Sequence, residues 1–81
     1  MKKFVVKFQV IQSSGKIPSL CNAITFVNTS LIDTVLVNNM PLKPQQTLSI
    51  EGNENEIDHS DYNVVLGTDP NTFYVITKFY K

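Results

Sequence analysis

The sequence contains no arginine and no tryptophan, and it has one cysteine, one histidine and three glycines among its 81 residues. Without arginine, the chain lacks the forked guanidinium that proteins use for two-point recognition of phosphates and carboxylates. Seven lysines balance seven acidic residues, so the net charge at pH 7 is zero. A neutral chain does not attract polyanions over a distance. We therefore expect neither nucleic acid nor a membrane among its partners.

The scarcity of cysteine and histidine limits the chemistry that the chain can perform. One cysteine cannot form a disulfide framework within the chain, and Cys21 with His59 supplies too few ligands for a zinc site. The same two residues could form a nucleophile and its base, but no arginine and no glycine-rich oxyanion loop surrounds Cys21. We expect a buried, reduced Cys21, no cofactor and no enzyme activity.

Long apolar runs are also missing from the sequence. Residues 4–6 are apolar and follow two lysines, but polar residues at Lys7, Gln9 and Gln12 interrupt the run. No small-residue cleavage site follows, and a membrane span needs about 20 apolar residues. We expect synthesis in the cytoplasm without a signal peptide.

What the sequence does contain is an alternation of apolar and polar residues with a period of two, which is typical of β-strands. Turn-forming residues separate the alternating segments, and residues 13–22 are expected to form a loop. The pattern predicts an all-β fold: a small antiparallel β-sandwich, or a partly open barrel, of six or seven strands in one domain over residues 1–81. The expected strands are residues 4–12, 23–28, 34–38, 40–42, 47–51, 62–66 and 72–80.

Two local patterns refine this expectation. In the first strand the residues Phe4, Val6, Phe8 and Val10 share one face, which we expect to face the core, while the opposite face is mostly polar. The pair at positions 38–39 is two asparagines, which tolerate positive φ and so predict a tight hairpin turn.

The small size of the chain indicates assembly. A core of about 80 residues gives about 3–5 kcal/mol of net stability, and small domains usually add disulfides or metals, which are not expected here. The first and last strands expose pairing groups unless another chain covers them. We therefore expect a homo-oligomer or docking on a larger protein surface. The contact candidates are the aromatic and apolar residues Phe4, Phe8, Tyr62, Phe73, Tyr74, Ile76 and Tyr80.

Residues 51–61 form an acidic segment without lysine. Clustered carboxylates can ligate calcium, and the candidate ligands are Glu54, Glu56, Asp58 and Asp61. Their spacing does not match an EF-hand loop. The alternative, which we favour, is a solvated loop without a metal, in which Asp58 caps a short turn. Such a loop is also a second contact candidate, for a lysine-rich partner surface.

A second functional alternative comes from the tyrosines. Tyr62, Tyr74 and Tyr80 could stack on sugar rings in a receptor- or carbohydrate-binding sandwich module, although tyrosines on the strands of small sandwiches are mostly packing or interface residues. This alternative predicts exposed, coplanar rings along a groove.

The order of turn signals between residues 24 and 66 resembles a small all-β module of virion proteins in tailed bacteriophages, especially those of Bacteroidetes-like hosts. In that module a strand ending in asparagine leads to a V-x-V-N-G-x-P-L-x-P-G hairpin, a G-N-x-x-E-x-D loop and a Y-x-V-x-F strand. This sequence departs from the pattern at Asn39, Gln45 and Leu66. The matching residues are Val35, Val37, Asn38, Pro41, Leu42, Pro44, Gly52, Asn53, Glu56, Asp58, Tyr62 and Val64.

The resemblance implies a structural role in a virion. It suggests an auxiliary or decoration protein of the capsid, or a small head–tail or fibre-base subunit, made in the host cytoplasm. The implied partners are other virion proteins, further copies of this chain, or both.

Overall fold

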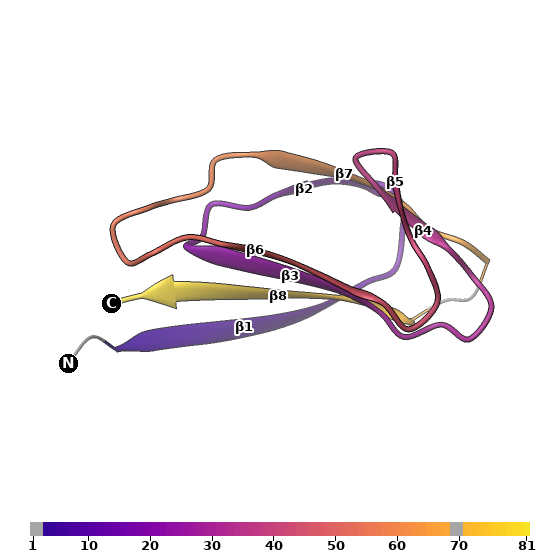
Figure 1. The fold of residues 1–81 in the computed structure, drawn as a ribbon, viewed down its shortest axis with the longest axis horizontal. Coiled ribbons are helices and arrows are strands. Elements are labelled where there is room, and N and C mark those ends of the chain that lie inside the picture. Colours follow the sequence, from indigo (N-terminus) through magenta and orange to yellow (C-terminus); the bar gives the residue numbers. More distant parts are fainter. Residues whose placement is uncertain (1–2, 69–70) are drawn as a thin grey trace.

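The computed structural model describes residues 3–68 and 71–81. Over these residues the fold is all-β, without helices, and two four-stranded antiparallel sheets face each other as layers that do not close into a barrel (Figure 1). The strands are β1 (Phe4–Ile11), β2 (Gly15–Pro18), β3 (Ala23–Asn28), β4 (Val35–Val37), β5 (Met40–Leu42), β6 (Thr47–Glu51), β7 (Asp61–Val65) and β8 (Phe73–Tyr80).

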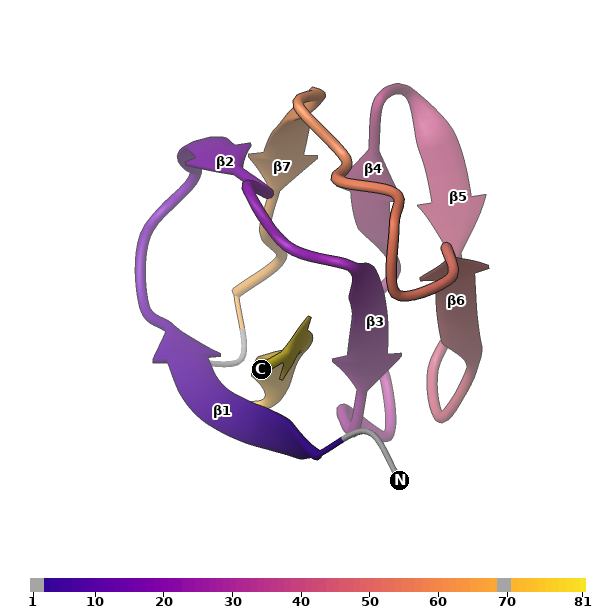
Figure 2. The ribbon, with the colours of Figure 1, turned by 90° about the vertical axis from the view of Figure 1, so that its left-hand side faces the viewer.

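Strand order fixes which edges are open. The first sheet has the order β1-β8-β3-β6, and the second sheet has the order β2-β7-β4-β5. Both chain ends lie at the same end of the first sheet, where β1 pairs along its whole length with β8 (Figure 1). Seen along the molecule, β1 and β2 form the two edges on one side and are joined by residues 12–14 (Figure 2).

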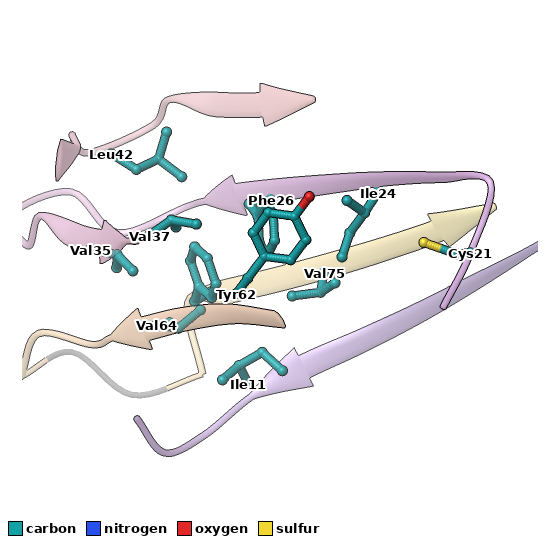
Figure 3. Packing of buried hydrophobic residues seen from close by; sticks show 11 residues of the cluster. Ile11, Cys21, Ile24, Phe26, Val35, Val37, Leu42, Tyr62, Val64 and Val75 are labelled. Atoms are coloured by element: carbon teal, nitrogen blue, oxygen red, sulfur yellow. The ribbon is translucent and has the colours of Figure 1, made fainter. Parts of the chain in front are cut away.

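The core lies between the sheets and is built from alternate residues of the strands, as the period of two requires (Figure 3). At its centre, Phe26 of β3 packs against Tyr62 of β7 and Phe73 of β8, with ring centroids 5.1 and 6.0 Å apart. The buried apolar side chains are Ile11, Cys21, Ile24, Phe26, Val35, Val37, Leu42, Tyr62, Val64, Phe73 and Val75.

Two buried asparagines connect strands to loops. The amide of Asn28 donates to the carbonyl oxygens of Asp33, Leu42 and Lys43 at 2.9–3.2 Å. The amide of Asn22 donates to the carbonyl oxygen of Glu56. Both side chains are buried, and these bonds give their polar groups the partners that burial demands.

The sequence-based expectations for the fold are confirmed in class and mostly in strand position. Asn38 and Asn39 have φ values of 50° and 65°, and they join β4 to β5 as expected. The expected loop at residues 13–22 is partly wrong, because Gly15–Pro18 forms β2 against β7 and raises the number of strands to eight over the described residues. The turn expected at residues 67–71 includes positions 69 and 70, which lie outside the described residues.

Candidate protein interface

The outer face of the first sheet is apolar where β1 and β8 meet. Their register places Phe4 opposite Tyr80 and Phe8 opposite Ile76. Since Phe73 and Val75 of β8 point into the core, the alternate residues of both strands point outward. The outward residues, here called the β1/β8 face, are Phe4, Val6, Phe8, Val10, Tyr74, Ile76, Lys78 and Tyr80.

The β1/β8 face is open to solvent over β1 and half-covered over β8. Phe8 is 71% exposed and Phe4 is 54% exposed, while Tyr74, Ile76 and Tyr80 are half-buried. Monomeric proteins seldom expose contiguous apolar surface of this kind unless it is an interaction site. Five of the seven contact candidates from the sequence therefore gather on one surface.

Lys78 is the one charged residue of the β1/β8 face. Its ammonium group lies 4.6 Å from the ring centroid of Phe4 and 4.8 Å from that of Tyr80. The two rings meet edge to face, with centroids 6.2 Å apart and an angle of 70° between their planes. A cation over aromatic rings is attracted to their electron-rich faces. The contact orders the end of the face next to the chain termini.

The free edge of β1 adjoins this face. The amide of Lys81 donates to the carbonyl oxygen of Lys3, its partner in the β1–β8 register. Hydrogen-bonded pairs alternate along an antiparallel ladder, so the odd-numbered residues of β1 are the ones whose backbone groups bond to β8. The amide of Tyr80 donates to Asn22 on the opposite side of β8, which agrees with this alternation. The backbone groups of Phe4, Val6, Phe8 and Val10 therefore point away from the molecule. No hydrogen bond to these groups is found over residues 3–68 and 71–81.

This placement corrects the expected orientation of β1. We expected Phe4, Val6, Phe8 and Val10 to face the core, but they face outward. Ile11, on the face expected to be mostly polar, is buried instead. The reversal has a physical cause: β1 pairs in register with β8, whose residues Phe73 and Val75 are fixed inside the sandwich.

Two contact candidates from the sequence lie in the core and are withdrawn. Tyr62 is 6% exposed and Phe73 is 2% exposed, so neither side chain offers surface to a partner. Tyr62 is compatible with the core because its hydroxyl group donates to Oδ2 of Asp58 at 2.5 Å.

The acidic segment is organised by local hydrogen bonds, and the calcium candidates are not brought together. Oε1 of Glu56 accepts from the amide of Asn53, and Oδ1 of Asp58 accepts from the amide of Ser60. Asp58 thus caps a backbone amide, but the short turn expected after it does not form, because Asp58 pairs with Cys21 instead. Glu54 and Asp61 are exposed. Within the described part of the chain no three His, Cys, Asp or Glu side chains are placed to hold a metal ion, which contradicts Glu54, Glu56, Asp58 and Asp61 as a ligand set.

Asp58 and Tyr62 shift each other's proton affinity. The hydrogen bond from the Tyr62 hydroxyl is the largest cause that lowers the pKa of Asp58 from 3.8 to about 2. Burial acts in the opposite direction with a smaller effect, and hydrogen bonds from Ser60 and Ser19 add to the lowering. Burial and the neighbouring carboxylate raise the pKa of Tyr62 to about 12. Both shifts favour the hydrogen-bonded pair of a neutral tyrosine and a charged aspartate at neutral pH.

Removing the Tyr62 hydroxyl is expected to make the protein less sensitive to acid. A carboxylate with a lowered pKa in the folded state adds stability above its unfolded pKa, near 4, and that stability is lost as the pH falls through about 2. Tyr62→Phe removes the largest cause of the shift. We expect urea unfolding at pH 5 and pH 2.5 to show a smaller loss of unfolding free energy for Tyr62→Phe than for wild type. Tyr74→Phe, the control on the outer face, should behave like wild type, and equal losses in all three proteins would contradict the assignment.

Cys21 does not have the surroundings of a reactive thiol. Its side chain is buried, and desolvation, followed by the charge of Asp58, raises the pKa of the thiol. A raised pKa disfavours the thiolate that nucleophilic attack requires. His59, the base that such a thiol would need, is exposed on the loop.

A polar cleft runs beside the inner face of β1, where the two sheets separate. It has a volume of about 570 Å³ and extends along residues 7–18 between β1 and β2. Its lining includes Lys7, Gln9, Gln12 and Lys16. Thus β1 presents an apolar face on one side and a polar cleft on the other.

Sequence reasoning missed one further apolar site. Leu31 and Ile32 are each 76% exposed, on the loop between β3 and β4, at the end of the molecule away from the termini (Figure 1). Two adjacent apolar residues between turn-forming residues could have indicated it. The described residues also contain no helix of the length and apolarity that a membrane span requires.

Comparisons with protein-family models, curated proteins and solved structures found no match. The resemblance to a bacteriophage virion module therefore stays a prediction from the sequence. The candidate interface depends on the geometry of β1 and β8 alone.

Proposed function

We propose that this protein is a non-enzymatic structural subunit that works by binding other protein chains, and that it serves in the virion of a tailed bacteriophage. The candidate positions are an auxiliary or decoration protein of the capsid, or a small head–tail or fibre-base subunit. The geometry of β1 supports assembly, and the pattern of residues 24–66 supports the virion setting.

One observation carries the proposal: β1 is an edge strand whose outward side chains are apolar and exposed. Burying apolar surface contributes roughly 25 cal/mol per Å², so a partner that covers Phe4 and Phe8 gains free energy that the monomer does not have. The free backbone groups of β1 add a directional contact. An enzyme site, by contrast, needs converging polar groups, whereas the surface most open to contact here is apolar.

The expected mode of action is repetition of weak contacts. A small surface on one copy gives weak affinity, but many copies on repeated sites multiply it, since each bound copy raises the effective concentration of the next contact. A virion provides such a repeated surface. The zero net charge of the chain allows close packing of copies without mutual repulsion.

The carbohydrate-binding alternative finds less support in the geometry. It expects a row of exposed, coplanar tyrosines, but Tyr62 is buried, and Tyr74 and Tyr80 are half-buried. The surface fits packing against protein side chains better than stacking on flat sugar rings.

The proposal is tested on purified particles of a phage that encodes the chain. Mass spectrometry should detect the chain in particles, in many copies. Purified wild-type protein should rebind particles that lack it, and Phe8→Lys should bind at least tenfold more weakly, because it places a charge within the apolar contact. Thr34→Lys is the matched control, since it adds the same charge at an exposed site just before β4 of the second sheet. Absence of the chain from particles would overturn the proposal.

A further inference from the structure

The edge of β1 is unprotected in comparison with the other three edges of the sandwich. Natural sheets block their edges with proline, charged residues, bulges or short strands. β5 is three residues long and contains Pro41, while β2 is four residues long and contains Lys16 and Pro18. β6 is five residues long and ends at Glu51. In contrast, β1 has eight residues and no proline, its one charged residue is Lys7 on the inner face, and it carries apolar side chains at every position whose backbone faces outward.

We propose that β1 pairs antiparallel with β1 of a second copy of this chain across a two-fold axis, so that two first sheets join into one continuous sheet. This inference rests on the proposed function, because it names a partner for the same surface. A two-fold contact requires a surface that is complementary to itself. The sequence of β1 meets that requirement.

The available backbone groups restrict the register. Only the even-numbered residues of β1 have free amide and carbonyl groups. In the joint, each hydrogen-bonded pair must therefore join an even-numbered residue of one copy to an even-numbered residue of the other. An axis at Phe8 pairs Phe8 with Phe8 of the second copy and Val6 with Val10. On the opposite face the same axis sets Lys7 against Gln9, next to the polar cleft. An axis at Lys7 would place two lysines directly opposite each other, which is destabilising.

Charge also favours a second copy as the occupant. The chain has no net charge, so two copies approach without long-range repulsion. Within β1 the one charged side chain is Lys7, and the Phe8-centred register separates it from its symmetry mate. Apolar side chains then meet apolar side chains at the centre of the joint, from Val6 to Val10, while Phe4 lies opposite Gln12 of the second copy.

The size of the contact predicts a weak dimer. The exposed fractions of the apolar residues of β1 range from 37% to 71%, for Phe4, Val5, Val6, Phe8 and Val10. Since a whole aromatic side chain has roughly 150–250 Å² of surface, these residues together expose on the order of 400 Å² of apolar surface on each copy. Twice that area lies below the roughly 1,200–2,000 Å² of stable interfaces. We therefore expect an equilibrium between monomer and dimer in solution that shifts toward the dimer as protein concentration rises.

Amide hydrogen exchange of the wild-type protein, measured by NMR at low and high concentration, tests the pairing. The amides of Val5, Lys7 and Gln9 bond to β8 and should be protected at both concentrations. The amides of Val6, Phe8 and Val10 should exchange quickly in dilute protein and become at least tenfold more protected in concentrated protein. Fast exchange of these amides at every concentration would overturn the inference.

A proline at position 6 gives the second measurement. The amide of Val6 points away from β8, so Val6→Pro removes a donor of the joint without removing a bond of the ladder. By sedimentation, Val6→Pro should weaken dimerisation at least tenfold, while Val6→Thr, which keeps the amide and the branched side chain, should stay within threefold of wild type. Equal dissociation constants for the two variants would overturn the inference.

The two proposals fail differently. A chain that stays monomeric by both measurements but is found in particles overturns the β1 joint and leaves the proposed function standing. A chain that dimerises through β1 but is absent from particles overturns the virion role and leaves the joint standing.

Discussion

Replacing Phe26 with alanine is expected to leave the chain unfolded at 25 °C. The side chain is 0% exposed and its ring contacts those of Tyr62 and Phe73. Truncation of a buried phenylalanine costs about 3–5 kcal/mol, because the lost transfer free energy and the remaining cavity add together. A small domain without disulfide or metal has about 3–5 kcal/mol of net stability. The substitution therefore removes most or all of it, which far-ultraviolet circular dichroism and the dispersion of amide NMR signals would show.

The matched control is Phe8→Ala, which deletes the same ring from an exposed position. Since Phe8 is 71% exposed on the β1/β8 face, its loss should change the unfolding free energy by no more than about 0.5 kcal/mol. Phe26→Leu, which keeps most of the apolar volume, should remain folded. If Phe8→Ala destabilised the chain as strongly as Phe26→Ala, the orientation of β1 would be wrong.

The fold class could be predicted because strand alternation is a local property. Seven strands follow from the period of two and from the turn residues between them, and the positive φ of Asn38 and Asn39 follows from their side chains. β2 could not be predicted, because glycine and proline in a four-residue segment usually end strands. It forms because Ile17 lies opposite Tyr62 of β7, which is a contact between distant parts of the chain.

The sequence predicted that β1 and β8 form the candidate interface, but it did not predict which face of β1 is exposed. Alternation separates β1 into two faces without saying which of them is buried. The more apolar face was expected inside, although the pairing partner β8 places it outside. The same limit explains Tyr62, which was expected to contact a partner but lies in the core, where Asp58 accepts from its hydroxyl group.

The sequence around Asn28 did not indicate its role either, since Asn28 is one of several asparagines that precede turns. Its position is decided by tertiary contacts. It lies on the inward face of β3, after Ile24 and Phe26, and is completely buried. A polar side chain there is stable only because all of its hydrogen-bonding groups have partners.

Asn28→Ala is expected to cost about 2–3 kcal/mol, a large part of the stability of the domain. The carbonyl oxygens of Asp33 and Leu42 lose a donor, and the amide of Ser30 loses its bond to Oδ1 of Asn28, while the carbonyl oxygen of Lys43 keeps its bond from the amide of Gln46. Each buried group that is left unsatisfied costs about 1–3 kcal/mol. Urea unfolding followed by circular dichroism measures the loss.

Asn28→Asp separates the donor role of the Asn28 side chain from its shape. Aspartate keeps an oxygen for the amide of Ser30, but it replaces the donating amide with an oxygen that faces three carbonyl groups, and it buries a charge. At pH 7 it should therefore be at least as destabilising as Asn28→Ala, despite its similar size. Asn63→Ala, at an exposed position of β7, should change stability by no more than about 0.5 kcal/mol. A loss below 1 kcal/mol for Asn28→Ala would mean that the connection from β3 to the β5–β6 turn does not depend on this amide.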